Sequence, residues 1–198
     1  MSTVSPALGR RERNKQDKLD RIVRAASTLF ASHGIDEVTT QQIAEAADIG
    51  AGTLFLYAKS KSELLLMVQN AHYATALERG RQAAASIDGV VDGIIAQMEP
   101  IVACNRVHVD NGRIYLREIL FGDASEPHHA EALEIVEQNE QDIAGILIAR
   151  AGATQTDALV LARVISSALL VTMAAADRAW SVAEVMTAVR TQIAAVIR

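Results

Sequence analysis

Apolar residues recur every three or four positions along most of the chain, a spacing that predicts amphipathic helices rather than strands. The first clear segment, Asn14–His33, places five apolar residues on one stripe of a helix: Ile22, Ala25, Ala26, Leu29 and Phe30. Gly34 follows directly, in the position where glycine commonly ends a helix. We expect Ile35 and Val38 to fold back onto the stripe, so that this helix supports the segments after it.

Further segments with the same periodicity bring the expected total to about nine helices and an all-α fold. After the first helix, the expected ranges are about 39–47, 51–58, 61–80, 86–106, 111–122, 126–151, 156–179 and 182–197, with Ser125 or Glu126 capping the seventh helix and Thr156 the eighth. Pro100 lies inside the fifth helix, where a missing backbone donor should kink it and leave room for a cavity.

The segment Thr39–Leu65 has the pattern of a helix-turn-helix. Thr39 with Gln42, and Ser60 with Glu63, form capping boxes that mark two helix starts. Between them, Gly50 is expected to permit a tight turn, and a short helix restarts at Ala51 with Leu54 as its buried anchor. Two short helices joined in this way place the second one in the major groove of DNA.

Composition fits an ordinary globular chain. The 198 residues suit one domain or two small ones, and half of them are hydrophobic, so a sizeable core forms without disulfides. Cys104 is the single cysteine, which fits a reducing cytoplasm. Met1–Gly9 is too polar and short for a secretory signal, and the apolar run Val164–Ala176 is too short to span a membrane, so it is interpreted as a buried helix.

Charge is distributed unevenly, although the net charge of −5 argues naively against nucleic acid. Met1–Arg24 contains seven Lys or Arg and three acidic residues, a net charge of +4. From Leu66 onward there are ten Arg and sixteen Asp or Glu, a net charge of −6. The N-terminal region alone therefore suits a polyanion, and we expect residues 1–13 to be a flexible basic arm that touches phosphate.

At the level of residues, Thr39–Leu65 resembles the DNA-binding segment of TetR-type transcriptional repressors. The matching positions are Ile43–Ala47, Gly52–Leu54, Tyr57, Ser60–Lys61 and Glu63–Leu65, together with Ala25, Ala26, Leu29, Phe30 and Gly34 of the first helix. Five positions depart from the family pattern: Asp48, Gly50, Ala51, Phe55 and Ala58. The resemblance implies a helix-turn-helix domain over 14–61 and a helical ligand-binding and dimerisation domain over 62–198.

The resemblance also implies roles for individual residues. The candidates for phosphate contact are Thr40, Thr53, Tyr57 and Lys61. The candidates to face base edges are Gln41, Ala51, Gly52, Thr53 and Phe55. Leu56 fits a contact with the DNA backbone and packing within the protein equally well. The implied partner is double-stranded DNA with a palindromic operator, because a two-fold dimer reads two half-sites.

The last two helices, about 156–197, have more apolar surface than one small domain covers, which favours a homodimer built as a four-helix bundle. The family resemblance further implies a small-molecule effector that releases the DNA, with no cofactor. Polar and aromatic residues interrupt the apolar background of the fifth and sixth helices and are the candidate pocket residues: Met98, Val102, Cys104, His108, Arg113, Tyr115, Arg117, Glu118 and Phe121.

Two other functions were weighed. An enzyme is disfavoured because the sequence has no nucleophile elbow, P-loop or dinucleotide fingerprint, and because the adjacent His128 and His129 point about 100° apart on a helix and make a poor metal chelate. The second is a helical adaptor whose helix-turn-helix no longer binds DNA, which the apolar third helix and the negative net charge permit. A mobility-shift assay with the upstream DNA separates an adaptor from a repressor.

Overall fold

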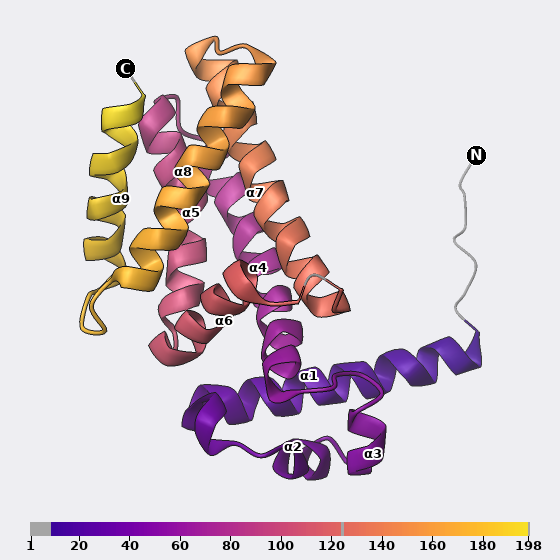
Figure 1. Ribbon diagram of the computed structural model, residues 1–198. Helices are drawn as coiled ribbons and strands as arrows, with labels where there is room; N and C mark the ends of the chain where they lie inside the picture. The colour runs from indigo at the N-terminus through magenta and orange to yellow at the C-terminus, as the bar shows by residue number, and fades with distance from the viewer. Residues whose placement is uncertain (1–8, 124, 198) are drawn as a thin grey trace. The chain divides into compact units, whose positions relative to one another are not determined.

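A computed structural model of the chain describes residues 9–123 and 125–197, and these residues form nine α-helices and no strands (Figure 1). In order, the helices are α1 (Arg10–Glu37), α2 (Thr40–Ala46), α3 (Ala51–Leu54), α4 (Lys61–Ala85), α5 (Val90–Arg106), α6 (Val109–Phe121), α7 (Pro127–Ala151), α8 (Gln155–Ala175) and α9 (Val182–Val196). The all-α fold expected from the sequence is therefore confirmed.

The chain divides into two compact units, residues 1–68 and 69–198, and α4 runs through the division. The expected division lay at residues 61 and 62, before the first turn of α4. Leu64, Leu65 and Val68 of that helix are buried and belong to the first unit. Of the expected flexible arm, residues 1–8 lie outside the described part, whereas Arg10–Arg13 already belong to α1.

The first unit is organised by α1. Ile22, Ala26 and Phe30 of α1 are almost fully buried, as the apolar stripe predicts. Gly34 interrupts the helix with a left-handed backbone (φ 76°), a conformation that glycine adopts without steric cost. Ile35 and Val38 after it are only 4% and 2% exposed, so both side chains are buried.

The second unit is a layered bundle in which α7 packs along α8, and α5 along α9 (Figure 1). Its core includes Ile94 and Met98 of α5, Leu116 of α6, and Ile143 and Leu147 of α7, none of which is more than 1% exposed. α5 continues as one helix from Val90 to Arg106, with Pro100 inside it. Apolar burial on this scale supplies most of the driving force for folding.

Capping residues set several helix starts. Thr39 and Gln42 bond reciprocally at the start of α2, so that expected capping box is present. At the start of α4 the Ser60 hydroxyl accepts from the backbone N–H of Glu63 at 3.1 Å, and Ser181 and Glu184 form a further capping box at α9. For α8 the expectation was wrong by two residues, because the Thr154 hydroxyl, not that of Thr156, accepts the backbone N–H of Asp157 at 3.2 Å. Thr156 lies inside the first helical turn.

α8 is the one helix among the described residues that is long and apolar enough to cross a membrane by length and composition, which is weak evidence on its own. Only 33% of its most apolar stretch is buried. The exposed part includes Val160, Val164 and Val171, which are 46–62% exposed and lie on one face because they are four and seven residues apart. This face, Val160, Val164 and Val171, is called the α8 valine stripe below.

Candidate functional site

The connection between α2 and α3 has one left-handed residue, and it is not the glycine. Asp48 has φ 52°, whereas Gly50 is extended with φ −71° and ψ 144°. The expectation that Gly50 provides the special turn was therefore wrong. Aspartate is among the few non-glycine residues that occupy the left-handed region, and the Arg21 guanidinium holds Asp48 through both its carbonyl oxygen and its carboxylate at 3.2 Å.

The segment from Ala51 to Ala58 presents apolar side chains outward. Only Ala51–Leu54 is a helix, shorter than the expected range, because the next residues make tight i to i−3 bonds such as Tyr57 N to Leu54 O at 2.9 Å. Leu54 and Ala58 are buried at 0% and 3% exposure, while Phe55 is 47% exposed and Leu56 is 84% exposed. The buried Leu54 and Ala58 therefore flank three residues, of which Phe55 and Leu56 are exposed and Tyr57 is half-buried.

The expected DNA-contact residues lie in α2, α3, α4 and the turn after α3, all within the first unit. Thr40 and Gln41 begin α2, Ala51–Thr53 form α3, and Lys61 begins α4. Gln41, Gly52 and Phe55 are exposed, and Thr40, Ala51, Thr53, Tyr57 and Lys61 are half-buried. None of these eight residues is enclosed in the core.

The side chains of Gln41 and Lys61 donate hydrogen bonds to other residues of the first unit. The Gln41 amide donates to the Glu45 carboxylate at 2.8 Å, one helical turn away. The Lys61 ammonium donates to the backbone carbonyl of Asp36 at 3.2 Å, which fixes its position beside the start of α4. An ammonium group has three N–H donors, so this bond leaves Lys61 able to meet a phosphate.

Leu56 lies on the surface of the first unit, whereas the sequence fitted contact with the DNA backbone and packing within the protein equally well. At 84% exposure it is not packed in the first unit. An outward-facing large apolar side chain next to Phe55 is the signal that could have favoured the contact role.

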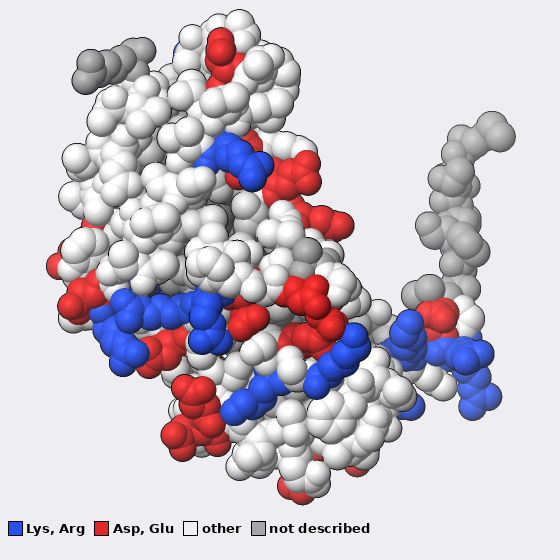
Figure 2. Space-filling model, in the orientation of Figure 1, with Lys and Arg blue, Asp and Glu red and all other residues white. Residues whose placement is uncertain are grey.

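Basic side chains gather over the first turns of α1 (Figure 2). The exposed members of this group are Arg10, Arg11, Arg13, Lys15 and Lys18. The group extends the positive charge that the sequence places near the N-terminus, although on a helix rather than on a flexible arm.

The candidate pocket residues of the second unit are dispersed. Met98 and Val102 lie in the core, and Phe121 is 82% exposed at the end of α6. His108 caps α6, accepting from the backbone N–H of Asn111 at 3.4 Å, while Arg113 donates to the Ala176 carbonyl at 2.8 Å. The remaining candidates are an adjacent ion pair on α6, Arg117 and Glu118 at 3.2 Å, and the half-buried Cys104, whose pKa is raised by burial to about 11.

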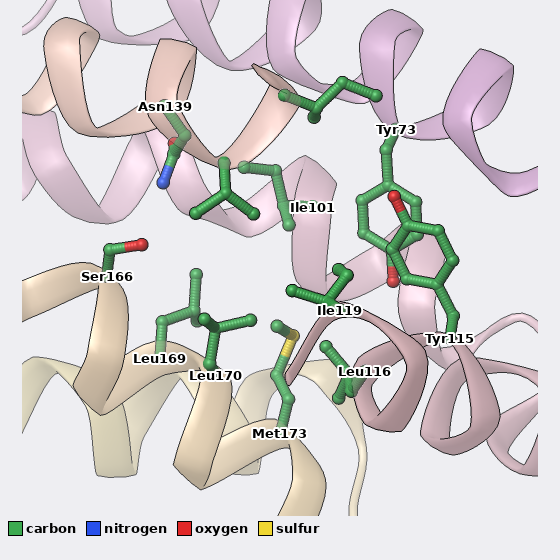
Figure 3. A pocket seen from close by; sticks show the side chains of 12 residues that line it. Tyr73, Ile101, Tyr115, Leu116, Ile119, Asn139, Ser166, Leu169, Leu170 and Met173 are labelled. Atoms are coloured by element: carbon green, nitrogen blue, oxygen red, sulfur yellow. The ribbon is translucent and has the colours of Figure 1, made fainter. Parts of the chain in front are cut away.

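Tyr115 alone among those candidates lines a cavity of about 40 Å³ in the second unit (Figure 3). Tyr73 of α4 and Tyr115 of α6 stand at one end of it, and Asn139 of α7 and Ser166 of α8 stand at the other. Eight aliphatic or methionine side chains from α5 to α8 form the rest of the wall, among them Ile101, Leu116, Ile119, Leu169, Leu170 and Met173. Residues from five helices meet here, so helical periodicity could not identify the set.

The two tyrosines belong to a buried polar network. Their rings stack with centroids 4.4 Å apart and planes 9° apart. The Tyr73 hydroxyl accepts from the Asn105 amide at 2.8 Å, and the Tyr115 hydroxyl donates to the Asn70 amide oxygen at 2.9 Å. Burial raises the pKa of both phenols, so both stay protonated at neutral pH.

The Asn70 amide connects three helices. From α4 it accepts from Tyr115 of α6 and donates to the carbonyl of His128 and the carboxylate of Glu131 on α7, both at 2.9 Å. A lining residue of the cavity is therefore hydrogen-bonded to the helix that continues into the first unit. Within the described residues, no group of three or more His, Cys, Asp or Glu side chains is placed to hold a metal ion.

Comparisons with known proteins agree with this arrangement. Residues 22–68 match the family model of bacterial regulatory proteins, tetR family. An uncharacterized HTH-type transcriptional regulator of Haemophilus influenzae is 37% identical over 51 residues, which is 26% of this chain and only 27% of that protein's length.

Solved structures match over most of the chain. The fold is similar to that of Thermus thermophilus FadR, a TetR family transcriptional repressor in complex with lauroyl-CoA, with a TM-score of 0.69 and 23% identity over 89% of this chain and 93% of that one. A TetR transcriptional regulator from Rhodococcus sp. RHA1 gives a TM-score of 0.69 with 14% identity over 93% and 97%. Residues 22–68 therefore match the tetR family of bacterial regulatory proteins, and the chain as a whole shares the all-α fold of solved TetR regulators.

Proposed function

We propose that the chain is a homodimeric transcriptional repressor, acting in the cytoplasm, which binds a palindromic operator and is released by a small-molecule effector. The observation that carries the proposal is the outward display of Phe55 and Leu56 between the buried anchors Leu54 and Ala58. Exposed apolar side chains that directly follow α3, in a unit that also presents the Thr53 hydroxyl and the Lys61 ammonium group, fit entry into a DNA groove.

Roles follow from chemistry and position. Thr40, Thr53, Tyr57 and Lys61 donate hydrogen bonds to phosphate oxygens and set the register on the duplex. The residues assigned to base edges are Gln41, Ala51, Gly52, Thr53 and Phe55, with Gln41 able to donate and accept and Phe55 able to pack on a thymine methyl. Exposure adds Leu56 to this surface.

Dimerisation is supported by the α8 valine stripe. Single exposed apolar residues are ordinary, but three valines on one face, at 46–62% exposure, make an apolar strip along a helix. α9 also exposes small residues that allow helices to approach closely: Ala183, Thr187, Thr191 and Ala194. Two helices from each of two copies make a four-helix bundle with two-fold symmetry.

Effector control is supported by the cavity and its connection to α4. Tyr73 of α4 lines the cavity, and Tyr115 in the same wall bonds to Asn70 of α4. The same helix begins at Lys61 in the first unit. A ligand that binds one arrangement of this helix more tightly than another shifts the population between a DNA-competent and a released state.

The DNA part of the proposal is tested by mobility shift with the DNA upstream of the gene, over a range of salt concentrations. Tyr57→Ala and Lys61→Ala should weaken binding to all sequences, and Lys61→Ala should lower the salt slope by about one. Gln41→Ala should instead change the preference among operator variants. Arg117→Ala removes one positive charge from the second unit and serves as the matched control. Absence of salt-dependent binding by the parent protein would favour the helical adaptor.

The dimer is tested by light scattering on matched valine variants. Val171→Glu places a carboxylate in the α8 valine stripe and should produce monomers. Val107→Glu makes the same exchange at a residue that is 79% exposed at the end of α5, and should leave the dimer intact. Equal masses for both variants and the parent would place the dimer contact elsewhere.

A further inference from the structure

The residues that line the cavity of the second unit indicate which kind of ligand it can bind. None of the lining residues that the structure describes carries a charge, and most are aliphatic. The tyrosine hydroxyls at one end are already bonded to Asn105 and Asn70. Asn139 and Ser166, on α7 and α8, are the polar groups left for a ligand (Figure 3).

Asn139 is the distinctive group of the pair. It is 5% exposed, and its amide oxygen has no hydrogen-bond partner in the described part of the chain. A buried acceptor without a partner is destabilising relative to a satisfied one. Ser166 is 3% exposed and directs its hydroxyl into the same end of the cavity. Rotation about the Asn139 Cβ–Cγ bond exchanges the amide oxygen and nitrogen at low cost, so a ligand can meet either end.

Resting on the function proposed above, we infer that the effector is an uncharged, mostly aliphatic molecule whose single polar group, a carboxamide or an alcohol, bonds to Asn139 and Ser166. A carboxylate at this position would be buried without a cation, which is far more costly than burying a neutral group. An entirely apolar ligand would leave the Asn139 oxygen unsatisfied. A neutral group that both donates and accepts completes the site.

The cavity also has to open. Its volume of about 40 Å³ is well below the roughly 150 Å³ that accommodates benzene in an apolar protein cavity. Met173 and Leu170 of α8 lie in the wall, and methionine in particular changes rotamer readily. The ligand therefore separates side chains of α8 from those of α5 and α6 as it enters.

The test compares three probes of equal chain length, hexanamide, 1-hexanol and hexanoate, by their effect on the thermal midpoint of the full chain. Hexanamide and 1-hexanol should raise the midpoint in a concentration-dependent way, because a ligand that binds only the folded state stabilises it. Hexanoate should not raise it. Equal stabilisation by hexanoate, or stabilisation by lauroyl-CoA with none by hexanamide, overturns the assignment.

Variants test the two polar groups separately. Asn139→Leu should be at least as stable as the parent without ligand, because it removes an unsatisfied buried acceptor, and should bind hexanamide about tenfold more weakly. Gln141→Leu, an amide-to-leucine exchange at an exposed position of the same helix, should bind like the parent. Ser166→Ala gives a second, smaller substitution that should also weaken hexanamide. Unchanged affinity in both Asn139→Leu and Ser166→Ala overturns the inference.

Operator binding by the same preparations separates this inference from the proposed function. Salt-dependent DNA binding with no response to any of the three probes refutes the ligand class and leaves the repressor standing. Response to hexanamide without DNA binding refutes the repressor and leaves the neutral-ligand site standing.

Discussion

Gly80 of α4 lies where two helices of the second unit cross, and its replacement by alanine should destabilise that unit. A Cβ atom at Gly80 would lie 2.2 Å from the backbone oxygen of Gln97 and 3.0 Å from its carbonyl carbon. Ordinary contacts begin at about 3.4 Å, so α4 and α5 would have to separate by about 1 Å at this point. Because the clashing atom belongs to a helix backbone, no side-chain rotation relieves it.

The expected magnitude is a net loss of about 1–3 kcal/mol, the usual cost of overpacking. The control is Gly145→Ala on α7, where a Cβ would meet no described atom within 4 Å. There alanine should stabilise by about 0.5–1 kcal/mol, because glycine is a poorer helix residue. Both variants replace glycine with alanine, yet the free energy of unfolding should fall in Gly80→Ala and rise in Gly145→Ala.

Urea unfolding followed by tryptophan fluorescence measures this difference. Trp180 is the single tryptophan and belongs to the second unit, so its signal reports that unit. With an m-value of about 1–3 kcal/mol per molar urea, the two midpoints should be separated by about 0.5 M or more. Coincident midpoints for Gly80→Ala and Gly145→Ala would refute the close crossing of α4 and α5.

Three further outcomes are expected. Cys104 should react with a disulfide reagent about a hundredfold more slowly in the native protein than in urea near pH 8, because burial raises the pKa of its thiol from 9.0 to about 11, and the native rate should still rise with pH beyond 9. Gly50→Ser should stabilise the first unit by a few tenths of a kcal/mol in thermal melts followed by circular dichroism, because a hydroxyl at this extended N-cap position can accept from the start of α3. Tyr115→Phe should lower the free energy of unfolding by about 1–3 kcal/mol in urea titrations, because it leaves the buried oxygen of Asn70 unsatisfied.

Local chemistry allowed much of the first unit to be predicted. The apolar stripe of α1, the stop at Gly34, the Thr39 capping box and the buried anchor Leu54 each depend on residues within one or two helical turns. The left-handed residue was assigned to Gly50 rather than Asp48 because glycine is the usual solution. Aspartate also tolerates this conformation, and Asp48 is bonded to Arg21, which lies 27 residues earlier in the sequence and is not visible as a partner in the local pattern.

The cavity could not be predicted in the same way. Helical periodicity identifies the inner face of each helix but not which residues of different helices meet. The clustering of polar residues on α5 and α6 therefore gave Tyr115 and missed Tyr73, Asn139 and Ser166. Interruption of an apolar stretch by Ser166 on α8 was visible in the sequence, yet serine is common enough in helices that it carried no weight.

A final expectation concerns the coupling between the cavity and DNA, and it follows from linkage rather than from any assumed motion. If hexanamide weakens operator binding by some factor, the operator must weaken hexanamide binding by the same factor, because both are paths around one thermodynamic cycle. Couplings of about 1–3 kcal/mol correspond to roughly 5–150-fold, well within the range of a fluorescence titration performed with and without operator DNA. The bond from Tyr115 to Asn70 joins the cavity wall to α4, so Tyr115→Phe should reduce both factors together. An unchanged coupling factor in Tyr115→Phe would mean that this bond does not connect the cavity to operator binding.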